Sequence, residues 1–470
     1  MNHINWMEEV LKRKEDFIKD LQGLLRIKSV LNENDKNPEA PLGQGIKDAL
    51  EYMLNMGNKD GFITKNVGNL AGHLEMGQGD KLIGILGHVD VVPEGDGWSV
   101  DPYGAVIKDG KIYARGSSDD KGPTIAAYYG MKIVKELGLP LDKRVRLIVG
   151  TDEESDWRCV EHYFAEEEMP DMGFVPDADF PIIFAEKGIS DYDIVQDIGT
   201  STPNADFKLL SFQSGRRYNM VPDFAEVHVQ MNSDLGKIDQ EYRNYLREWE
   251  LEGDVSANGN ELTLTLVGKS AHGAEPRNGK NAGIFLAKFL RSLGLDAQGK
   301  KFVETISSFF NQSRGEVFGI SYQDEESGEL TINVGIMNYT KEKGGHIGLN
   351  MRYPVTFDIE KGKAKIEETL KKNELKMENF TDSKPTYVKK DDPLIQTLQR
   401  VYEEQTGEKA ELLAIGGGTY SRALDHGVAF GALFPGREDV MHQKDEYAIV
   451  DDLLKATAIY AQAIYELAKV

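Results

Sequence analysis

The chain has 470 residues, of which 40% are hydrophobic and 28% charged, which is the composition of a globular protein of two or three domains. Its single cysteine, Cys159, excludes an internal disulfide framework and a cysteine-based zinc site. The formal net charge of −23 predicts that the chain binds neither nucleic acid nor an anionic membrane surface, because both would repel it.

The N-terminal segment predicts an amphipathic helix rather than a targeting signal. Apolar residues recur on one helical face at Trp6, Val10, Phe17, Leu21 and Leu24, with charged residues between them. A secretion signal would need an uninterrupted apolar run, and no later stretch is apolar for long enough to span a membrane. We therefore expect a cytoplasmic protein.

The first part of the chain predicts an α/β fold. Residues 81–92 and 144–150 are apolar runs that we expect to form buried strands. Between them, Pro123 marks a helix start, and residues 124–137 have helical spacing. The order strand, helix, strand is typical of a mostly parallel sheet flanked by helices. A further amphipathic helix is expected over residues 451–469.

The middle of the chain has the alternating pattern of half-exposed antiparallel strands. The alternating segments are residues 207–213, 224–231, 261–267 and 347–353, with helical stretches near 281–293 and 360–371. The sequence therefore predicts an α+β domain inserted into the α/β domain. We expect residues 1–187 and 384–470 to form the α/β domain. Residues 188–383 would form the inserted domain, with a length sufficient for two subdomains.

Polar clusters follow the predicted strands of the α/β part, where the sites of such sheets assemble. In His88-Val-Asp90, the carboxylate can orient the imidazole and leave its other nitrogen for a metal, although such a pair also arises by chance. The other clusters are Asp119-Asp120, Asp152-Glu153-Glu154, Asp177 with Asp179, and the segment around His442. Helix capping or a solvated acidic turn would also explain adjacent carboxylates.

Taken together, the clusters predict a metal site. Like charges concentrated at strand ends repel one another unless a cation or a proton neutralises them. Two imidazoles and three carboxylates suit Zn²⁺, Mn²⁺ or Co²⁺, and five ligands are more than one ion needs. We therefore predict a pair of ions that share a carboxylate. The five candidate ligands are His88, Asp119, Glu154, Asp177 and His442.

The ordered motifs resemble those of the M20 family of co-catalytic metallopeptidases, and within it the bacterial dipeptidases of the PepV type. The matching segments lie between residues 87 and 446, most of the chain. They are GHVDVVPEGDGW, YARGSSDDKGP, GTDEES, PDADFP, EKG, YNMVPD, GKSAHGAEP, NMRYP, AIGGGTYSRAL and FPGREDVMHQKDE. The resemblance implies an α/β catalytic domain with an inserted lid domain, and hydrolysis of unblocked dipeptides.

The resemblance also assigns the metal ligands. It implies two Zn²⁺ ions per subunit, with Mn²⁺ or Co²⁺ as substitutes. His88 and Asp177 would bind one ion, and Glu154 and His442 would bind the other. Asp119 would bridge both ions.

Three further residues match catalytic positions of the family. Glu153 would be the general base that accepts a proton from the attacking water and passes it to the leaving amine. Asp90 would orient His88. His272 would contact the tetrahedral oxyanion from the lid.

The substrate-binding residues also follow from the resemblance. Arg352 suits a bidentate grip on a free terminal carboxylate, and Asn219 matches another substrate-binding position. The backbone of Gly416, Gly417 and Gly418 would offer N–H groups to the same carboxylate, or form only a tight turn that enters a helix. The partner of the substrate's amino group stays open among Asp90, Glu153 and Asp179.

The order of two lid segments departs from that of many relatives. Here residues 218–222 precede residues 270–272, and the lid region has about 200 residues. Many relatives use a smaller lid to dimerise, and its histidine reaches into the partner's site. Because an enlarged lid could supply that group within one chain, we predict a monomer.

Two other functions compete with a dipeptidase. One is an amide hydrolase of the same family that acts on N-acylated amino acids as a deacylase or desuccinylase. The other is a non-catalytic module that binds a metal or a peptide. The presence of Glu153 argues against the module, since a scaffold has no use for a general base beside the ligands.

Overall fold

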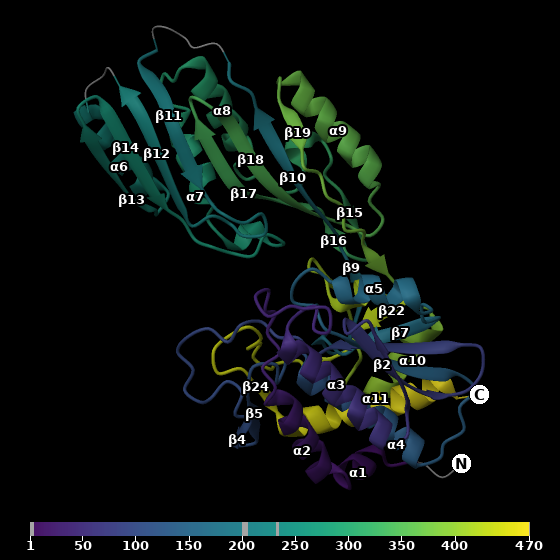
Figure 1. Cartoon of the computed structure of the whole chain (residues 1–470). Coiled ribbons are helices and arrows are strands. Elements are labelled where there is room, and N and C mark those ends of the chain that lie inside the picture. The colour runs from purple at the N-terminus through teal and green to yellow at the C-terminus, as the bar shows by residue number, and fades with distance from the viewer. Residues whose placement is uncertain (1–3, 200–204, 232–234, 470) are drawn as a thin grey trace. The chain divides into compact units, whose positions relative to one another are not determined.

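The computed structural model describes residues 4–199, 205–231 and 235–469 (Figure 1). The chain divides into two compact units. The first unit comprises Met1–Ala185, Tyr387–Leu413 and Gly418–Val470, and the second comprises Glu186–Thr386 and Ala414–Gly417. Among the described residues, no helix combines the length and the apolar character needed to cross a membrane.

The first unit is built on a mixed sheet in the strand order β1, β2, β6, β3, β7, β22 and β9. The bounds are β1 (Ile63–Val67), β2 (Ala71–Gly77), β3 (Leu82–His88), β6 (Arg144–Gly150), β7 (Met172–Val175), β9 (Ile182–Glu186) and β22 (Gly427–Ala429). The middle strands β6, β3, β7 and β22 are parallel, and the flanking strands run antiparallel. Every residue of β3 is buried, which explains its continuous apolar sequence.

Helices cover both faces of this sheet. The helices of the unit are α1 (Trp6–Leu11), α2 (Lys14–Leu25), α3 (Gln44–Lys59), α4 (Lys121–Glu136), α5 (Arg158–Glu166), α10 (Pro393–Thr406) and α11 (Val450–Ala468). On one face, α5 packs through Tyr163 against Leu86 and Ile148. On the other face, Gly87 leaves room for Thr124 of α4, and α11 packs against α4. The α/β prediction is confirmed.

Short strands complete the first unit. They are β4 (Val106–Lys108), β5 (Lys111–Tyr113) and β24 (Tyr447–Ile449), which form one small sheet, and β8 (Ala178–Asp179) with β23 (Ala432–Leu433). Two more, β20 (Thr386–Tyr387) and β21 (Leu412–Ile415), lie at sequence boundaries between the units. The pairing of β24 with β5 joins two segments more than 300 residues apart in the sequence.

Two predicted elements differ from the structure. The N-terminal helix is two helices, because the backbone at Arg13 leaves the helical region (φ −115°, ψ 8°). The apolar face predicted for it is nevertheless buried. The strand predicted over residues 81–92 ends at His88, because Val91 donates its N–H to Ser29 outside the sheet. The strand at 144–150 is confirmed, and α4 begins two residues before Pro123.

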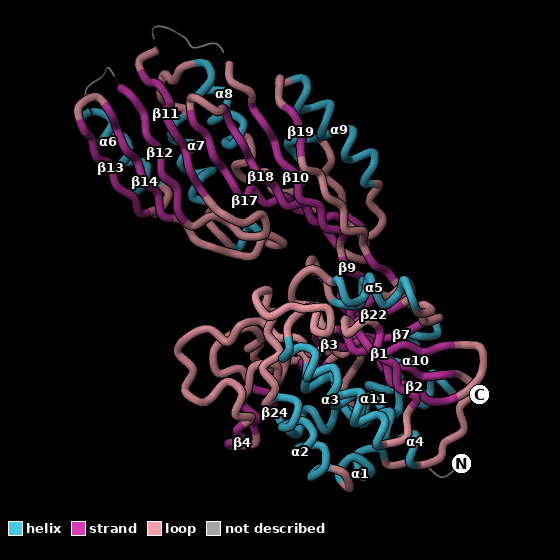
Figure 2. The backbone as a smooth tube through the Cα atoms, in the orientation of Figure 1, coloured by secondary structure: helices cyan, strands magenta, loops and turns pink. Residues whose placement is uncertain are grey.

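The second unit contains an antiparallel sheet in the order β13, β14, β12, β11, β17, β18, β10 and β19, seen side by side in Figures 1 and 2. Its strands are β10 (Gly188–Gln196), β11 (Phe207–Ser214), β12 (Phe224–Met231), β13 (Glu252–Asn258), β14 (Glu261–Val267), β17 (Thr331–Thr340), β18 (Gly344–Tyr353) and β19 (Lys376–Glu378). A separate hairpin pairs β15 (Gln323–Asp324) with β16 (Gly328–Glu329). The predicted strands at 224–231 and 261–267 are confirmed with the same bounds.

One face of this second sheet is covered by helices. They are α6 (Leu235–Glu248), α7 (Ala282–Leu290), α8 (Ala297–Ser307) and α9 (Ile359–Lys372), with the short 3₁₀ turns η1 (Pro276–Asn278) and η2 (Glu316–Phe318) elsewhere in the unit. Alternate residues of β12 such as Val227 and Val229 point into this core, while His228 between them is half-buried on the other face. This alternation is the α+β pattern that the sequence predicts.

Candidate metal centre

The carboxyl edge of the first sheet gathers three of the predicted ligands and the predicted general base, Glu153. His88 is the last residue of β3, and β3 is parallel to both β6 and β7. Glu153 and Glu154 lie in the turn after β6, and Asp177 follows β7. Because parallel strands end at the same edge, these four side chains emerge close together. Most of them lie in loops, drawn in pink in Figure 2.

The remaining two ligands reach the same edge from other directions. Asp119 lies two residues before the first residue of α4, at the end of the loop that follows β5. The positive end of the helix dipole favours a carboxylate there. His442 belongs to the loop before β24 and has a left-handed backbone, with φ 62°. A non-glycine residue in that region costs free energy, so its surroundings must hold it.

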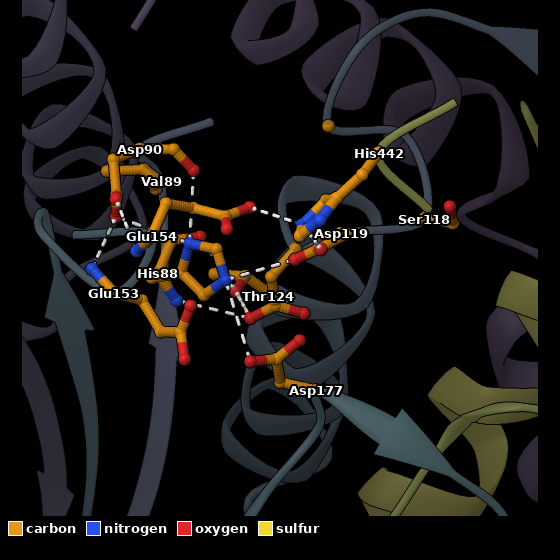
Figure 3. Close-up of polar contacts among 12 residues, drawn as sticks. His88, Val89, Asp90, Ser118, Asp119, Thr124, Glu153, Glu154, Asp177 and His442 are labelled. Atoms are coloured by element: carbon orange, nitrogen blue, oxygen red, sulfur yellow. Dashed lines mark hydrogen bonds and ion pairs between the residues drawn. The ribbon is translucent and has the colours of Figure 1, made fainter. Parts of the chain in front are cut away.

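His88, Asp119 and Asp177 form one group (Figure 3). Nε2 of His88 lies 3.2 Å from Oδ1 of Asp119 and 3.5 Å from Oδ2 of Asp177. The imidazole is fully buried, yet Nε2 has no hydrogen-bond partner among the described residues. A buried nitrogen left without a partner beside two carboxylates is the expected geometry of a metal ligand.

Asp119, Glu154 and His442 form a second group. Nε2 of His442 lies 2.9 Å from Oδ2 of Asp119 and 3.1 Å from Oε1 of Glu154. In each group, the potential ligand atoms all lie within 4.8 Å of one another. The two oxygens of Asp119 therefore face the two imidazoles, one each, as Figure 3 shows.

The charges of the cluster are poorly balanced by the protein alone. Burial raises the pKa of Glu153 to about 9, and burial with the charge of Asp119 raises the pKa of Asp177 to about 6. Burial also raises the pKa of Glu154. Hydrogen bonds to Asp119 and Glu154 raise the pKa of His442 to about 10. Carboxylates that resist ionisation so close together are stabilised by a cation between them.

The donor set fits a divalent metal. Neutral imidazole nitrogen and carboxylate oxygen are the ligands of Zn²⁺ and of similar ions. A third group combines His88 with Glu153 and Glu154. Asp119 belongs to the first and second groups and Glu154 to the second and third, so each of these two carboxylates is grouped with both His88 and His442.

Asp90 supports both the imidazole and the acidic turn. Its Oδ1 and its backbone carbonyl lie 3.3 and 3.0 Å from Nδ1 of His88. Its two carboxylate oxygens accept the backbone N–H groups of Glu153 at 3.2 Å and Glu154 at 3.0 Å. Asp90 is 2% exposed, so this carboxylate is already occupied. Of the three candidates for the substrate's amino group, Glu153 belongs to a metal-binding group, and the exposed Asp179 belongs to none.

The predicted substrate-binding residues of the second unit also lie together. His272 pairs with Met220 in an isolated β-bridge, and the carbonyl of Asn219 accepts the N–H of Gly273 at 2.7 Å. Burial and the charge of Arg352 lower the pKa of His272. His272 and Asn219 are exposed, while Arg352 is 5% exposed.

The glycine run lies beside Arg352. Nη1 of Arg352 donates to the carbonyl of Gly416 at 2.9 Å, and its Nε donates to Oδ1 of Asn350 at 2.8 Å. After Gly416, Gly417 and Gly418, the chain enters the short 3₁₀ helix η3 (Tyr420–Ala423). The turn into a helix is therefore present, and a role in carboxylate binding stays a prediction.

Several supporting residues were missed by the sequence analysis. Oδ2 of Asp120 accepts the N–H of His88 at 3.1 Å and the hydroxyl of Thr124 at 2.9 Å. The ring of Tyr420 packs edge-on against His88 and Trp157, and Trp157 donates to the carbonyl of Glu153 at 2.7 Å. Asp120 belongs to a quoted motif, but nothing in the spacing indicated its partners. Imidazoles and carboxylates gathered at the carboxyl edge of an α/β sheet are the arrangement of a candidate metal site.

Comparison with known protein families identifies the family of this chain. The family described as "Peptidase family M20/M25/M40" matches residues 84–466. The chain belongs to this family, and it is a metallopeptidase that uses a divalent metal. The resemblance stated from the sequence is confirmed.

Two relatives match over nearly the whole chain, and each is named as a "Putative dipeptidase". YtjP of Bacillus subtilis is 52% identical over 467 residues, which is 99% of this chain and 100% of the relative. A protein of Staphylococcus epidermidis is 46% identical over 464 residues, which is 98% of this chain and 99% of the relative.

Solved structures of more distant proteins have the same fold. Aminoacylhistidine dipeptidase from Vibrio alginolyticus matches with a TM-score of 0.58 at 13% identity, covering 96% of each chain. Aminopeptidase PepT from Bacillus cereus matches with a TM-score of 0.55 at 15% identity, covering 97% of this chain and 99% of that chain. At these identities the likeness concerns the fold alone.

Proposed function

We propose that this protein is a dipeptidase that hydrolyses unblocked dipeptides with two zinc ions. The observation that supports the proposal most is the convergence of two ligand groups on Asp119, with Glu153 next to both. The names of the relatives at 52% and 46% identity support the substrate class. Cytoplasmic residence stays a prediction from the sequence.

The metal ions would be held by the two groups described above. His88 and Asp177 would hold one ion, Glu154 and His442 the other, and Asp119 both. Mn²⁺ and Co²⁺ suit the same ligands and are proposed as substitutes. When bound, such a pair of ions lowers the pKa of water and polarises the peptide carbonyl.

The protein supplies the proton transfers and the orientation. The carboxylate of Glu153 accepts a proton from the attacking water and delivers it to the nitrogen of the leaving amine. Two backbone contacts fix the peptide around Glu153: its N–H donates to Asp90, and its carbonyl accepts from Trp157. Asp90 also holds the ring of His88 in place.

The second unit would recognise the far end of the substrate. We propose that Arg352 binds the free carboxylate of the dipeptide, with Asn219 and the glycine run at 416–418 contributing further contacts. His272, whose lowered pKa keeps its ring neutral near pH 7, would donate an N–H to the developing oxyanion. All of these residues except Gly418 belong to the second unit, which supports a shared role.

The substrate class is tested by comparing a free dipeptide with its N-acetyl form. We expect kcat/KM to be at least tenfold higher for Ala-Ala than for N-acetyl-Ala-Ala, a difference of about 1.4 kcal/mol in transition-state binding. Adding a chelator should abolish turnover of both, and Zn²⁺ should restore it. Preference for the acetylated compound would favour the rival amide hydrolase. Wild-type protein that binds Zn²⁺ and hydrolyses neither compound would favour the non-catalytic module.

We further propose that the protein acts as a monomer. The second unit has a described sheet and four helices of its own, and it contains both His272 and Arg352. Light scattering coupled to size exclusion should give a mass near 52.5 kDa for the zinc-loaded protein. A stable dimer at micromolar concentration would overturn this part of the proposal.

A further inference from the structure

Glu446 lies at a junction between two loops of the candidate metal centre. It follows His442 by four residues and directly precedes β24. Because β24 pairs with β5, the carbonyl of Glu446 accepts the N–H of Ala114 at 3.1 Å. The chain continues from Ala114 into the loop that ends at Asp119. The backbone pairing therefore brings Glu446 next to that loop.

The carboxylate of Glu446 accepts hydrogen bonds from four residues of this loop. Oε1 accepts the N–H of Ser118 at 2.9 Å, the N–H of Asp119 at 3.2 Å and the hydroxyl of Ser118 at 3.1 Å. Oε2 accepts Nη1 of Arg115 at 2.6 Å and the N–H of Gly116 at 3.1 Å. One side chain thus holds three backbone N–H groups of the loop, those of Gly116, Ser118 and Asp119.

This arrangement requires a buried charge. Glu446 is 0% exposed and Arg115 is 1% exposed. Burying a carboxylate is costly unless donors replace water, and here five donors do so. Arg115 in turn donates to the carbonyls of Pro93 and Glu94 at 3.4 and 3.3 Å. An isolated ion pair would not need backbone donors from the loop that presents a metal ligand.

We propose that Glu446 is a positioning residue that fixes the carboxylate of Asp119 between the two metal-binding groups. The inference rests on the proposed two-metal function. The contact from the N–H of Asp119 orients its backbone, and the sequence link to His442 ties the opposite ligand to the same anchor. Loss of the anchor would weaken metal binding without removing any ligand.

The variant Glu446→Gln tests the proposal because it preserves the shape of the side chain. Both oxygens of Glu446 accept N–H groups, whereas an amide has one acceptor and one donor. Whichever way the amide turns, its NH₂ group meets N–H donors of the loop. We expect the variant to bind Zn²⁺ about 10–100-fold more weakly than the wild type, measured by competition with a chelator.

A matched control separates positioning from general stability. Glu75 accepts a hydrogen bond from Nε of Arg146 at 2.7 Å, and Nη2 of Arg146 lies 2.6 Å from the same oxygen, in a largely buried ion pair between β2 and β6. Glu75→Gln therefore removes a comparable charge from the same unit. Thermal unfolding of the metal-free proteins should show a similar loss for both variants, but the control should bind Zn²⁺ within about twofold of the wild type.

If Glu446→Gln does not fold, two smaller substitutions test the same contact. Ser118→Ala removes only the hydroxyl contact to Oε1 and should weaken Zn²⁺ binding about threefold. Ser117→Ala is its control, since Oγ of Ser117 has no hydrogen-bond partner among the described residues. Equal Zn²⁺ affinity in Ser118→Ala and Ser117→Ala would overturn the proposal.

The outcomes also distinguish this inference from the proposed function. If the wild type binds Zn²⁺ and His88→Ala does not, the metal centre stands, and Glu446→Gln then decides the role of Glu446. Wild-type affinity in Glu446→Gln, or an equal loss in Glu75→Gln, overturns the positioning role alone. Wild-type protein that binds no Zn²⁺ overturns the proposed function itself.

Discussion

Replacing Glu153 by glutamine is expected to lower kcat for a free dipeptide by on the order of 10³–10⁴-fold, the upper part of the range for general acid–base catalysis. The amide keeps the size of the side chain but cannot accept a proton. The backbone of Glu153 is held by Asp90 and by Trp157 and would not move. KM should change little, because substrate grip is assigned to other residues.

The zinc content of Glu153→Gln shows whether its loss of kcat comes from the missing base or from a missing metal ion. Glu153→Gln should retain as much Zn²⁺ as the wild type, measured by elemental analysis after dialysis, because both groups that share Asp119 lack Glu153. The group of His88, Glu153 and Glu154 offers the alternative that Glu153 is itself a ligand. Loss of one zinc equivalent in Glu153→Gln would support that alternative and contradict the general base.

Asp156 provides the matched control for this experiment. It lies in the same acidic turn, and its side chain is 76% exposed, with Arg158 as a distant partner at 4.0 Å. Asp156→Asn removes one carboxylate from the turn without touching the three metal-binding groups. Its kcat should stay within about twofold of the wild type, as for most surface substitutions.

The sequence predicted the parts of the fold whose pattern is local. Strict alternation in β12 and β14 reflects a sheet with one covered face, so their bounds could be predicted from the sequence. The helix break at Arg13 could not be predicted, because the apolar spacing continues across it and only the backbone turns. The end of β3 depended on Ser29, a partner far away in the sequence.

In the candidate site, too, local patterns could be predicted and contacts between distant segments could not. The sequence predicted a cluster because ligand-type residues follow apolar strands, and parallel strands end together. The contacts of Asp90 with Glu153 and Glu154 could not be predicted. These residues follow Asp90 by 63 and 64 positions, and their contact depends on how two distant loops fold onto each other. Glu446 was missed for a related reason. In a run of charged residues it has the pattern of a solvated turn, and only the pairing of β24 with β5 buries it.

The comparison of Asp119→Ala with His442→Ala tests whether two ions share one carboxylate. Asp119 belongs to two ligand groups and His442 to one. We therefore expect Asp119→Ala to lose both zinc equivalents and His442→Ala to lose only one. The loss of Zn²⁺ affinity in Asp119→Ala should exceed the roughly 10–100-fold loss that is typical when a residue hydrogen-bonded to a metal ligand is removed. Turnover should fall in both variants at least as far as in Glu153→Gln.

Zinc-to-protein ratios after dialysis against a fixed free Zn²⁺ concentration measure this difference directly. Asp156→Ala serves as the control that keeps both ions.

The different burial of the two ligands strengthens the comparison. His442 has a side chain that is 54% exposed, so its removal leaves a water-accessible gap, whereas the side chain of Asp119 is 9% exposed between two imidazoles. Without the Asp119 carboxylate, both groups would lose a negative charge, and two cations so close together would repel more strongly. An Asp119→Ala variant that retains one tightly bound ion would show that the groups bind independently, and the shared carboxylate would then be wrong.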